Sequence, residues 1–167
     1  PEALDPYEAQ RISQAVKKLR LRYVVITSVA RDDLLDHGAS LFTRAIKAIR
    51  EQNPFTSIEV HTPDFWGGDS DPLIALRNQR KRLSTVLAAE PVCFNHNLET
   101  VERLQPEVRR GATYQRSLGL IQGAREMAPQ IPTKSGLMLG LGEEDYEIVQ
   151  TLKDLRSVGC EKVTLGQ

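Results

Sequence analysis

Two hydrophobic patterns alternate along the chain. Apolar residues recur at helical spacing over 12–19, behind an Asp5-Pro6 pair that is typical of a helix start. The run Tyr23–Thr27 follows, and because it is β-branched and almost wholly apolar, it predicts a strand buried on both faces. The same order of helix then strand repeats to the end of the chain. The further predicted helices lie at 42–49, 73–87, 113–124 and 148–155, and the further predicted strands at 57–61, 92–97, 135–141 and 162–165.

This order predicts an α/β fold with a parallel sheet and right-handed crossovers. The spacing of the strands favours a partial (β/α) barrel of the TIM type, with about five parallel strands in a single domain over 1–167. Five strands cannot close the usual eight-stranded barrel. We therefore expect an interior piece of a longer α/β protein, and the alternative is a small, complete open sheet.

Composition narrows the class of protein. The 167 residues carry 22 basic and 22 acidic side chains, and this zero net charge argues against a nucleic-acid binder held by phosphate contacts. No apolar run approaches the ~20 residues of a membrane span. Cys93 and Cys160 lie far apart without metal-ligand spacing, so this chain supplies neither a zinc site nor a complete iron–sulfur site. Scarce cysteine predicts a reducing compartment, a bacterial cytoplasm or an organelle stroma or matrix.

Polar residues follow the predicted strands at their carboxyl ends. They fall in 27–33, 62–68, 95–99 and 166–167, and in parallel α/β folds these ends meet at one rim where function collects. Such a rim suits a polar ligand with amine, carboxylate and hydroxyl groups.

Each of these features also has a purely structural explanation. The turn 31–33 can be a local ion pair with a capping aspartate, and Asn95 and Asn97 can satisfy loop backbone. A lone histidine such as His96 is more often structural than a ligand. The basic residues of 77–82 are expected on a solvated helix face, because they lack interleaved aromatics.

Glycine spacing marks the stretch 133–143, with glycines at 136, 140 and 142. A dinucleotide fingerprint would need a further glycine where Asp145 stands, and no Walker lysine follows. Glycine within a strand lets a ligand approach the bare backbone, so a flat ring could rest there. Lys134 could instead form a Schiff base, although it lies at the start of its strand, the wrong end for barrel catalysis.

Read together, four stretches resemble the lipoyl synthase family of radical S-adenosylmethionine enzymes. They are YVVITSVARDDL at 23–34, NHNLETV at 95–101, IPTKSGLMLGLGE at 131–143 and TLGQ at 164–167. The resemblance covers essentially the whole chain in order. It implies a sulfurtransferase that inserts sulfur at C6 and C8 of an octanoyl chain on a lipoyl-domain protein or H protein.

The resemblance also implies the cofactors. One [4Fe–4S] cluster cleaves S-adenosylmethionine to a radical, a second cluster is consumed as the sulfur donor, and flavodoxin or ferredoxin supplies electrons. The cluster ligands are expected outside this chain: the family's CxxxCxxC loop belongs just ahead of the first helix, and a C-terminal Arg-Ser-Ser-Tyr segment is missing. Cys93 and Cys160 match none of these ligands and are expected in the core. We therefore expect no catalytic or metal-binding residue here, and an isolated chain that is inactive and binds S-adenosylmethionine weakly or not at all.

The family's binding residues carry over to matching positions as expectations. The methionine amine, the ribose hydroxyls, the methionine carboxylate and the adenine ring each have candidate partners. The amine is assigned to Thr27 and Ser28, and the ribose hydroxyls are assigned to Asn97 and Glu99. The carboxylate is assigned to Arg116 and Ser117, with Arg31 as the alternative. The strand on which adenine rests is assigned to Gly136, Met138, Gly140 and Glu143, and Gln167 is assigned to the adenine or substrate side.

Two other functions stay open from the residues alone. One is another barrel enzyme, such as an aldolase that uses Lys134. The other is a non-catalytic α/β module that binds a small metabolite at the polar rim.

Overall fold

The computed structural model describes residues 4–67 and 69–167, and its strands form one parallel sheet. The strand order is β1-β2-β3-β4-β5, so each strand lies beside its neighbour in sequence, as in a barrel wall. The strands are β1 Tyr23–Thr27, β2 Ser57–His61, β3 Cys93–Asn95, β4 Thr133–Met138 and β5 Lys162–Gly166. The helices are α1 Glu8–Leu19, α2 Ala39–Gln52, α3 Pro72–Leu87, α4 Gln105–Val108, α5 Tyr114–Met127 and α6 Asp145–Ser157, and a 3₁₀ turn, η1, spans Glu102–Leu104.

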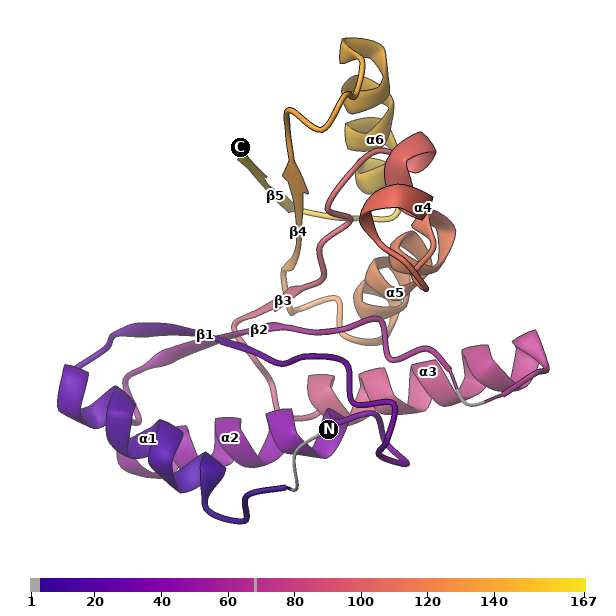
Figure 1. Ribbon diagram of the computed structural model, residues 1–167. Helices are drawn as coiled ribbons and strands as arrows, with labels where there is room; N and C mark the ends of the chain where they lie inside the picture. The colour runs from indigo at the N-terminus through magenta and orange to yellow at the C-terminus, as the bar shows by residue number, and fades with distance from the viewer. Residues whose placement is uncertain (1–3, 68) are drawn as a thin grey trace.

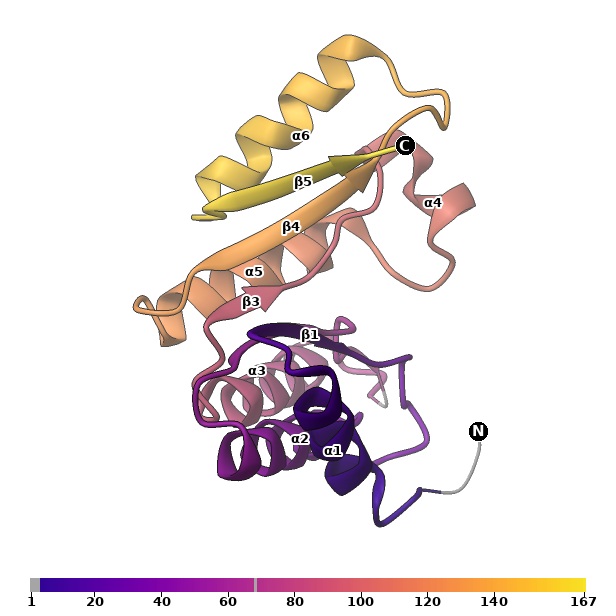
Figure 2. The same ribbon diagram turned by 90° about the vertical axis from the view of Figure 1, so that its left-hand side faces the viewer.

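The sheet is curved, and the helices cover its outer face (Figures 1 and 2). Ile58 and Val60 of β2 and Phe94 of β3 point to this side and are fully buried against Ile46 and Ile49 of α2. A second apolar cluster joins Leu137 of β4 to α5 and α6. Alternation along β1 and β2 therefore places every second side chain in the helix-covered core, whereas every residue of β5 is exposed. The predicted α/β class and the five parallel strands are confirmed.

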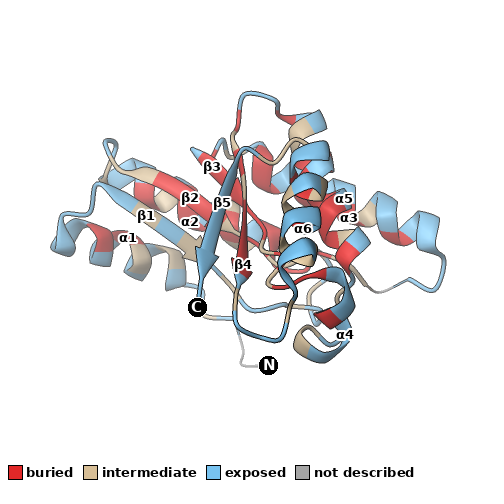
Figure 3. Cartoon of the chain, turned by 90° about the horizontal axis from the view of Figure 1, so that it is seen from above, coloured by how far each residue is buried: buried red, intermediate tan, exposed pale blue. Residues whose placement is uncertain are grey.

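The inner face of the sheet is open at its two edge strands, which lie exposed in Figure 3. Tyr23 and Val25 of β1 are 49% and 50% exposed, whereas Val24 and Ile26 pack on the core. The prediction that 23–27 is buried on both faces is therefore wrong. An apolar run shows only that the side chains on both faces of a strand can be buried. In this structure the helices cover one face of β1, and the other face is exposed.

Strand β3 is shorter than predicted, and the chain beyond it makes an excursion from the sheet. It leaves the ladder after Asn95 and returns at Glu99, which pairs with Leu137 of β4. Glu99 N–H donates to Gly136 O at 2.9 Å, and Met138 N–H donates to Glu99 O at 2.7 Å. Glu99 holds a left-handed backbone conformation with φ 66°. The excursion turns 96–99 toward the carboxyl ends of β1 and β2.

Two short helical turns, η1 and α4, follow this excursion and were not predicted. Gln105 begins α4, and its buried side-chain amide donates to Leu98 O at 2.7 Å and Thr100 O at 2.9 Å. These bonds fix α4 against the loop that carries Glu99.

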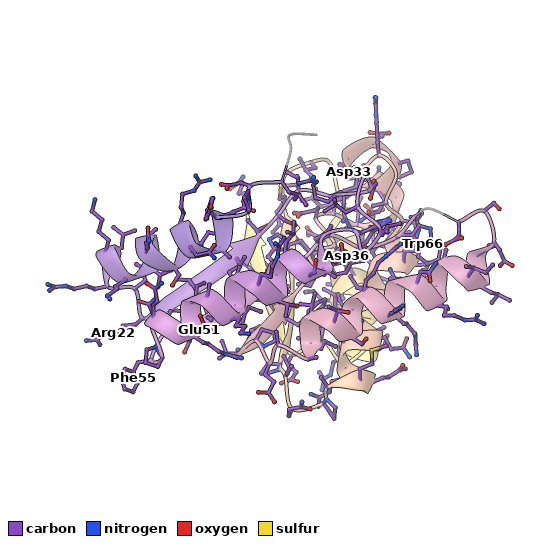
Figure 4. The ribbon with its side chains drawn as sticks, turned by 90° about the horizontal axis from the view of Figure 1, so that it is seen from below. Arg22, Asp33, Asp36, Glu51, Phe55 and Trp66 are labelled. Atoms are coloured by element: carbon purple, nitrogen blue, oxygen red, sulfur yellow. The ribbon has the colours of Figure 1, made fainter. Side chains whose placement is uncertain are left out.

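Arg82 of α3 joins two loops at the same end of the molecule. Its guanidinium donates to Phe65 O at 2.7 Å and to Leu35 O at 3.3 Å, and the residue is only 9% exposed. The expected solvated face is therefore wrong for Arg82, although Arg77, Arg80 and Lys81 are exposed. Figure 4 shows Asp33, Asp36 and Trp66 on this loop-bearing side, at the opposite end of α2 from Arg22 and Phe55. Among the described residues, no helix is long and apolar enough to cross a membrane.

Candidate ligand-binding site

A polar pocket lies at the carboxyl ends of β1, β2 and β3. We call it the rim pocket, and its volume is about 150 Å³. It brings together four of the residues expected to bind ligand, and it adds five others. The lining residues are Thr27, Ser28, His61, Thr62, Pro63, His96, Asn97, Glu99 and Arg109.

Asn97 lies flat against the backbone of β4 at Gly136. A Cβ at position 136 would stand 2.8 Å from Asn97 Oδ1 and 2.9 Å from Asn97 Cγ. The sequence suggested that a ligand ring could rest on the backbone of Gly136. In the structure the carboxamide of Asn97 lies there instead. Gly136 contributes to the site by giving Asn97 its place.

The rim pocket carries both signs of charge and two unsatisfied hydroxyls. The Glu99 carboxylate and the Arg109 guanidinium line the same cavity. Ser28 Oγ and Thr62 Oγ1 are buried, and neither has a hydrogen-bond partner among the described residues. A buried hydroxyl without a partner costs free energy, which a ligand with polar groups would recover. This donor and acceptor set fits a ligand that carries hydroxyls, an amine and a carboxylate.

His61 ends β2 and lines the same pocket. Burial lowers its pKa, and the carboxylates of Glu99 and Glu59 oppose that shift. An imidazole with a lowered pKa is neutral at pH 7, so it can both donate and accept a hydrogen bond.

His96 is the hub of a hydrogen-bond network behind the pocket. Its Nδ1 lies 2.9 Å from Thr62 O, and its Nε2 lies 3.0 Å from Ser117 Oγ. Arg109 Nη1 donates to the same Ser117 Oγ at 3.0 Å. Burial lowers the pKa of His96 to about 3, so the imidazole is neutral. The network therefore links β2, β3, α5 and the end of α4.

Three residues expected to hold a carboxylate lie elsewhere. Arg31 makes two bonds to Asp33, at 2.8 and 2.7 Å, and lines a separate groove of about 360 Å³ between α1 and α2 that also reaches Thr27 and Ser28. Ser117 is fully buried beneath His96 and is not among the lining residues. Arg116 lines a neighbouring pocket that it shares with Arg109.

Arg116 is also engaged by neighbouring side chains. Its guanidinium lies 5.0 Å from the centre of the Trp66 ring and 3.7 Å from Asp64 Oδ2. Its stacking on Trp66 is a cation–π contact. Arg116 is therefore held against the loop after β2 and does not line the rim pocket.

The glycine-spaced stretch after β4 forms a tight turn beside the end of β5. Gly140 has φ 90°, and the Glu143 carboxylate accepts hydrogen bonds from Gly140 N at 2.5 Å and Leu141 N at 2.8 Å. These backbone bonds lower the pKa of Glu143. Gln167 lies close to Gly140, and Met138 is 42% exposed. These predicted residues share one end of β4 and β5 but do not line the rim pocket.

Lys134 lies at the second position of β4, as expected. Its Nζ lies 2.9 Å from Glu59 Oε1, and the Tyr23 hydroxyl donates to Glu59 Oε2 at 2.5 Å. Glu59 is only 2% exposed. The Lys134 amine thus neutralises a buried carboxylate, which leaves it poorly placed to act as a Schiff-base nucleophile.

The sequence analysis placed Thr62 at the rim without assigning it a ligand, and it missed Arg109 and His61. Arg109 follows a four-residue helix that the sequence did not predict, so no strand end pointed to it. His61 and Thr62 do end a predicted strand, and their position alone was the available signal.

Metal ligands do not gather in the part of the chain that the structure describes. Among residues 4–67 and 69–167, no three histidine, cysteine or acidic side chains could hold one ion. Cys93 is buried and Cys160 is half-buried, and burial raises both thiol pKa values, that of Cys160 to about 11. These thiols favour the protonated form, whereas a cluster needs thiolates. The described residues therefore fit the organic part of the expected cofactor set and not the clusters.

The fold and site define a class: a parallel-strand partial barrel with a polar ligand pocket at its carboxyl rim. The family profile described as "Radical SAM superfamily", where SAM is S-adenosylmethionine, matches residues 1–155, so the chain belongs to that superfamily. Among curated relatives, it is 66% identical over its whole length to "Lipoyl synthase 2" of Parasynechococcus marenigrum and 67% identical to that of Prochlorococcus marinus strain MIT 9313. "Lipoyl synthase" of Trichlorobacter lovleyi is 52% identical over the whole chain.

The chain spans about half the length of these curated relatives, 56%, 55% and 55% respectively. Two solved structures share its fold at low identity. Hydroxymethylglutaryl-CoA lyase from Pseudomonas aeruginosa matches 99% of the chain and 52% of its own length, at TM-score 0.65 and 15% identity. Coproporphyrinogen III oxidase from Escherichia coli, a radical SAM enzyme, matches 95% of the chain and 36% of its own length, at TM-score 0.56 and 17% identity. The resemblance to lipoyl synthases and the TIM-like fold are confirmed.

Proposed function

We propose that this chain is a barrel segment of a lipoyl synthase, which inserts two sulfur atoms at C6 and C8 of a protein-bound octanoyl chain. One observation carries the proposal: the whole chain is 52–67% identical to relatives of that name. The proposed acceptor is an octanoylated lipoyl-domain protein or H protein. Flavodoxin or ferredoxin is the proposed electron donor, and a bacterial cytoplasm the proposed location.

The rim pocket is the proposed binding site for part of S-adenosylmethionine. Glu99 and Asn97 would bind the ribose hydroxyls, since the two oxygens of a carboxylate can each accept a hydrogen bond from a hydroxyl. The Ser28 hydroxyl, which has no hydrogen-bond partner among the described residues, would accept a hydrogen bond from the amine, beside Thr27. At about 150 Å³ the cavity is smaller than sites that enclose a whole drug-sized ligand, so the remaining part would lie along the open inner face of the sheet.

The turn after β4 is the proposed adenine side. Met138 and Gly140, with Gln167 opposite them, form an exposed edge of the barrel wall. Glu143 keeps this turn in shape through its two backbone hydrogen bonds. When bound, S-adenosylmethionine and two [4Fe–4S] clusters supply the radical and the sulfur, and this chain's residues bind and orient the nucleotide.

The other functions considered are not favoured. An aldolase would need Lys134 free, and its amine lies 2.9 Å from a buried carboxylate. A metabolite-binding module would share the rim pocket but would leave the high identity to lipoyl synthases unexplained.

The test uses the protein that carries this sequence, at its natural full length and with its clusters reconstituted without oxygen. It is incubated with an octanoylated lipoyl domain, S-adenosylmethionine and a reductant, and the domain is examined by mass spectrometry for two added sulfur atoms. Glu99→Gln should slow product formation roughly tenfold or more, because a hydrogen bond to a charged group is lost. Glu102→Gln, at an exposed carboxylate outside the rim pocket, should retain the activity.

Two results would contradict the proposal. One is a wild-type protein that leaves the octanoyl chain unchanged. The other is a Glu99→Gln variant as active as the Glu102→Gln control, which would remove Glu99 from the site.

A further inference from the structure

One ion pair crosses the inner face of the sheet. Lys134 of β4 is in register with Asn95 of β3, yet its Nζ reaches past β3 to Glu59 Oε1 on β2, at 2.9 Å. Glu59 is in register with Cys93, two positions before Asn95 on β3. The Lys134 side chain therefore lies over β3, between Cys93 and Asn95. We call the pair of Lys134 and Glu59 the cross-bar.

The cross-bar accounts for burial on a face that no described helix covers. Phe94 points into the helix layer, so its neighbours Cys93 and Asn95 point to the inner face. They are nevertheless only 1% and 6% exposed. Burial raises the pKa of the Cys93 thiol, and there the Glu59 carboxylate raises it further while the Lys134 ammonium lowers it. Both charges of the cross-bar thus lie close to the residue that they cover.

The buried end of the cross-bar is held by a second hydrogen bond. The Tyr23 hydroxyl donates to Glu59 Oε2 at 2.5 Å, and Glu59 is only 2% exposed. The Lys134 side chain is 25% exposed, so part of its stem faces the open side of the sheet. Because its ammonium is tied to a fixed carboxylate, the four-carbon stem of this lysine becomes a fixed part of the inner wall.

The cross-bar lies beneath the rim pocket. His61, which lines that pocket, follows Glu59 by two positions on β2 and points to the same face. Two positions along a strand correspond to roughly 7 Å. Apolar side chains are exposed on this face: Val25 of β1, in register with Glu59, is 50% exposed, and Met138 of β4 is 42% exposed. The inner face therefore offers an apolar chain a short path from the rim pocket to the Lys134 stem.

The proposed function needs the far end of an acyl chain at this place. Sulfur would enter at C6 and C8 of the octanoyl chain, and C8 is its last carbon, so the methyl end must come to the rim pocket where the nucleotide would bind. A longer chain would push its methyl end deeper, against the Lys134 stem. Displacement of that stem would leave the Glu59 carboxylate buried without its cation, which is strongly unfavourable.

We propose that the cross-bar is the floor of the acyl-chain site and sets the length of chain that the protein modifies. Lys134 contacts the methyl end of the chain, and Glu59 is a positioning residue that fixes the lysine. The inference rests on the proposed function, because it takes the octanoyl chain as the ligand of the inner face.

The test compares octanoylated and decanoylated lipoyl domains as substrates of the full-length protein with reconstituted clusters. The chain-length preference is the ratio of the two kcat/KM values for sulfur insertion, followed by mass spectrometry. The wild-type protein should prefer the octanoyl chain by about tenfold or more, since one surplus methylene in a closed pocket already has an effect of this size. Lys134→Ala with Glu59→Gln removes the stem without leaving an unpaired carboxylate, and the preference should fall to roughly threefold or less.

Lys134→Met with Glu59→Gln is the matched control. It loses the same ion pair but keeps an unbranched stem of similar length, so it should retain most of the wild-type preference. Urea denaturation shows whether each double variant is folded. If Lys134→Ala with Glu59→Gln does not fold, Lys134→Val with Glu59→Gln also shortens the stem, favours the strand and should show the same fall in preference.

Three results would overturn the inference and leave the proposed function standing. The first is a wild-type protein that modifies octanoyl and decanoyl domains equally well. The second is a folded Lys134→Ala or Lys134→Val double variant that keeps the wild-type preference. The third is a Lys134→Met control that loses the preference to the same extent, because loosening of the sheet would then explain the loss. A wild-type protein that leaves the octanoyl chain unchanged would overturn the inference together with the proposed function.

Discussion

Substitution of Gly136 by alanine tests the contact on which the geometry of Asn97 depends. The added Cβ would lie 2.8 Å from Asn97 Oδ1, 2.9 Å from Cγ and 3.1 Å from Nδ2. Cβ atoms essentially never approach other heavy atoms to less than 3.0 Å, so the carboxamide must move. The backbone of Gly136 cannot yield, because it accepts a hydrogen bond from Glu99 N and pairs with Thr164 of β5.

The size of the effect follows from where Asn97 can go. Overpacking of a rigid core costs about 1–3 kcal/mol. Asn97 is only half-buried and borders the rim pocket, so it can swing into that space, and the stability loss should stay near 1 kcal/mol. The displaced carboxamide then occupies the ligand's volume. Binding of S-adenosylmethionine should therefore weaken by tenfold or more, which corresponds to about 1.4 kcal/mol or more.

Calorimetric titration of the full-length protein, together with urea denaturation, separates the two effects. Gly119→Ala is the matched control, because position 119 lies on α5 with nothing within 4 Å of an added Cβ. This control should gain about 0.5–1 kcal/mol of stability from helix propensity and bind normally. A Gly136→Ala protein that binds as tightly as the Gly119→Ala protein would refute the reasoning, since it would mean that Asn97 does not need the bare backbone.

Three further outcomes are expected. Lys134→Met should lower the free energy of unfolding, measured by urea denaturation, by roughly 2 kcal/mol, which is less than for a fully buried ion pair because Lys134 is 25% exposed. Adding Glu59→Gln should recover much of this loss, because it removes the carboxylate that was left unpaired. A double variant no more stable than the single one would refute the pairing. The pKa of His96 is about 3 in the folded protein and 6.5 in the unfolded chain, so the unfolded chain binds one more proton between these pH values. The free energy of unfolding should therefore fall by about 1.4 kcal/mol per pH unit as the pH drops from 6.5 toward 3. A His96→Gln variant with the same pH dependence of stability would contradict this. Arg82→Met should cost about 1–3 kcal/mol and speed proteolysis near Phe65, because that carbonyl loses its donor; wild-type cleavage rates would refute the link.

The fold could be read from the sequence because its signals are local. β-branched runs at 23–27 and 57–61 matched β1 and β2 at both ends, and Thr113 caps α5, where its hydroxyl accepts from Arg116 N at 3.3 Å. The strand at 92–97 was predicted too long, because the polar residues after Asn95 continue an alternating pattern. In the structure the backbone leaves the sheet after Asn95. Such an excursion depends on pairing with β4, which a single segment does not reveal.

The site could be read only in part. The family resemblance assigned Thr27, Ser28, Asn97 and Glu99, which also lie at the ends of predicted strands, and these four line the rim pocket. Arg109 could not be found this way, because its position depends on α4 and on a hydroxyl from a distant helix. A choice among several arginines requires knowing which of them already contact carboxylates, aromatic rings or hydroxyls. These contacts form only in the tertiary structure.

The left-handed backbone at Glu99 has a consequence for evolution. A side chain in this conformation costs about 1–2 kcal/mol, whereas glycine adopts it freely. Selection for heat resistance alone would therefore favour Glu99→Gly, and the same change would delete the carboxylate of the rim pocket. Under the proposed function, stability and ligand binding therefore call for different residues at position 99, so a thermostable variant that carries glycine there should bind S-adenosylmethionine more weakly.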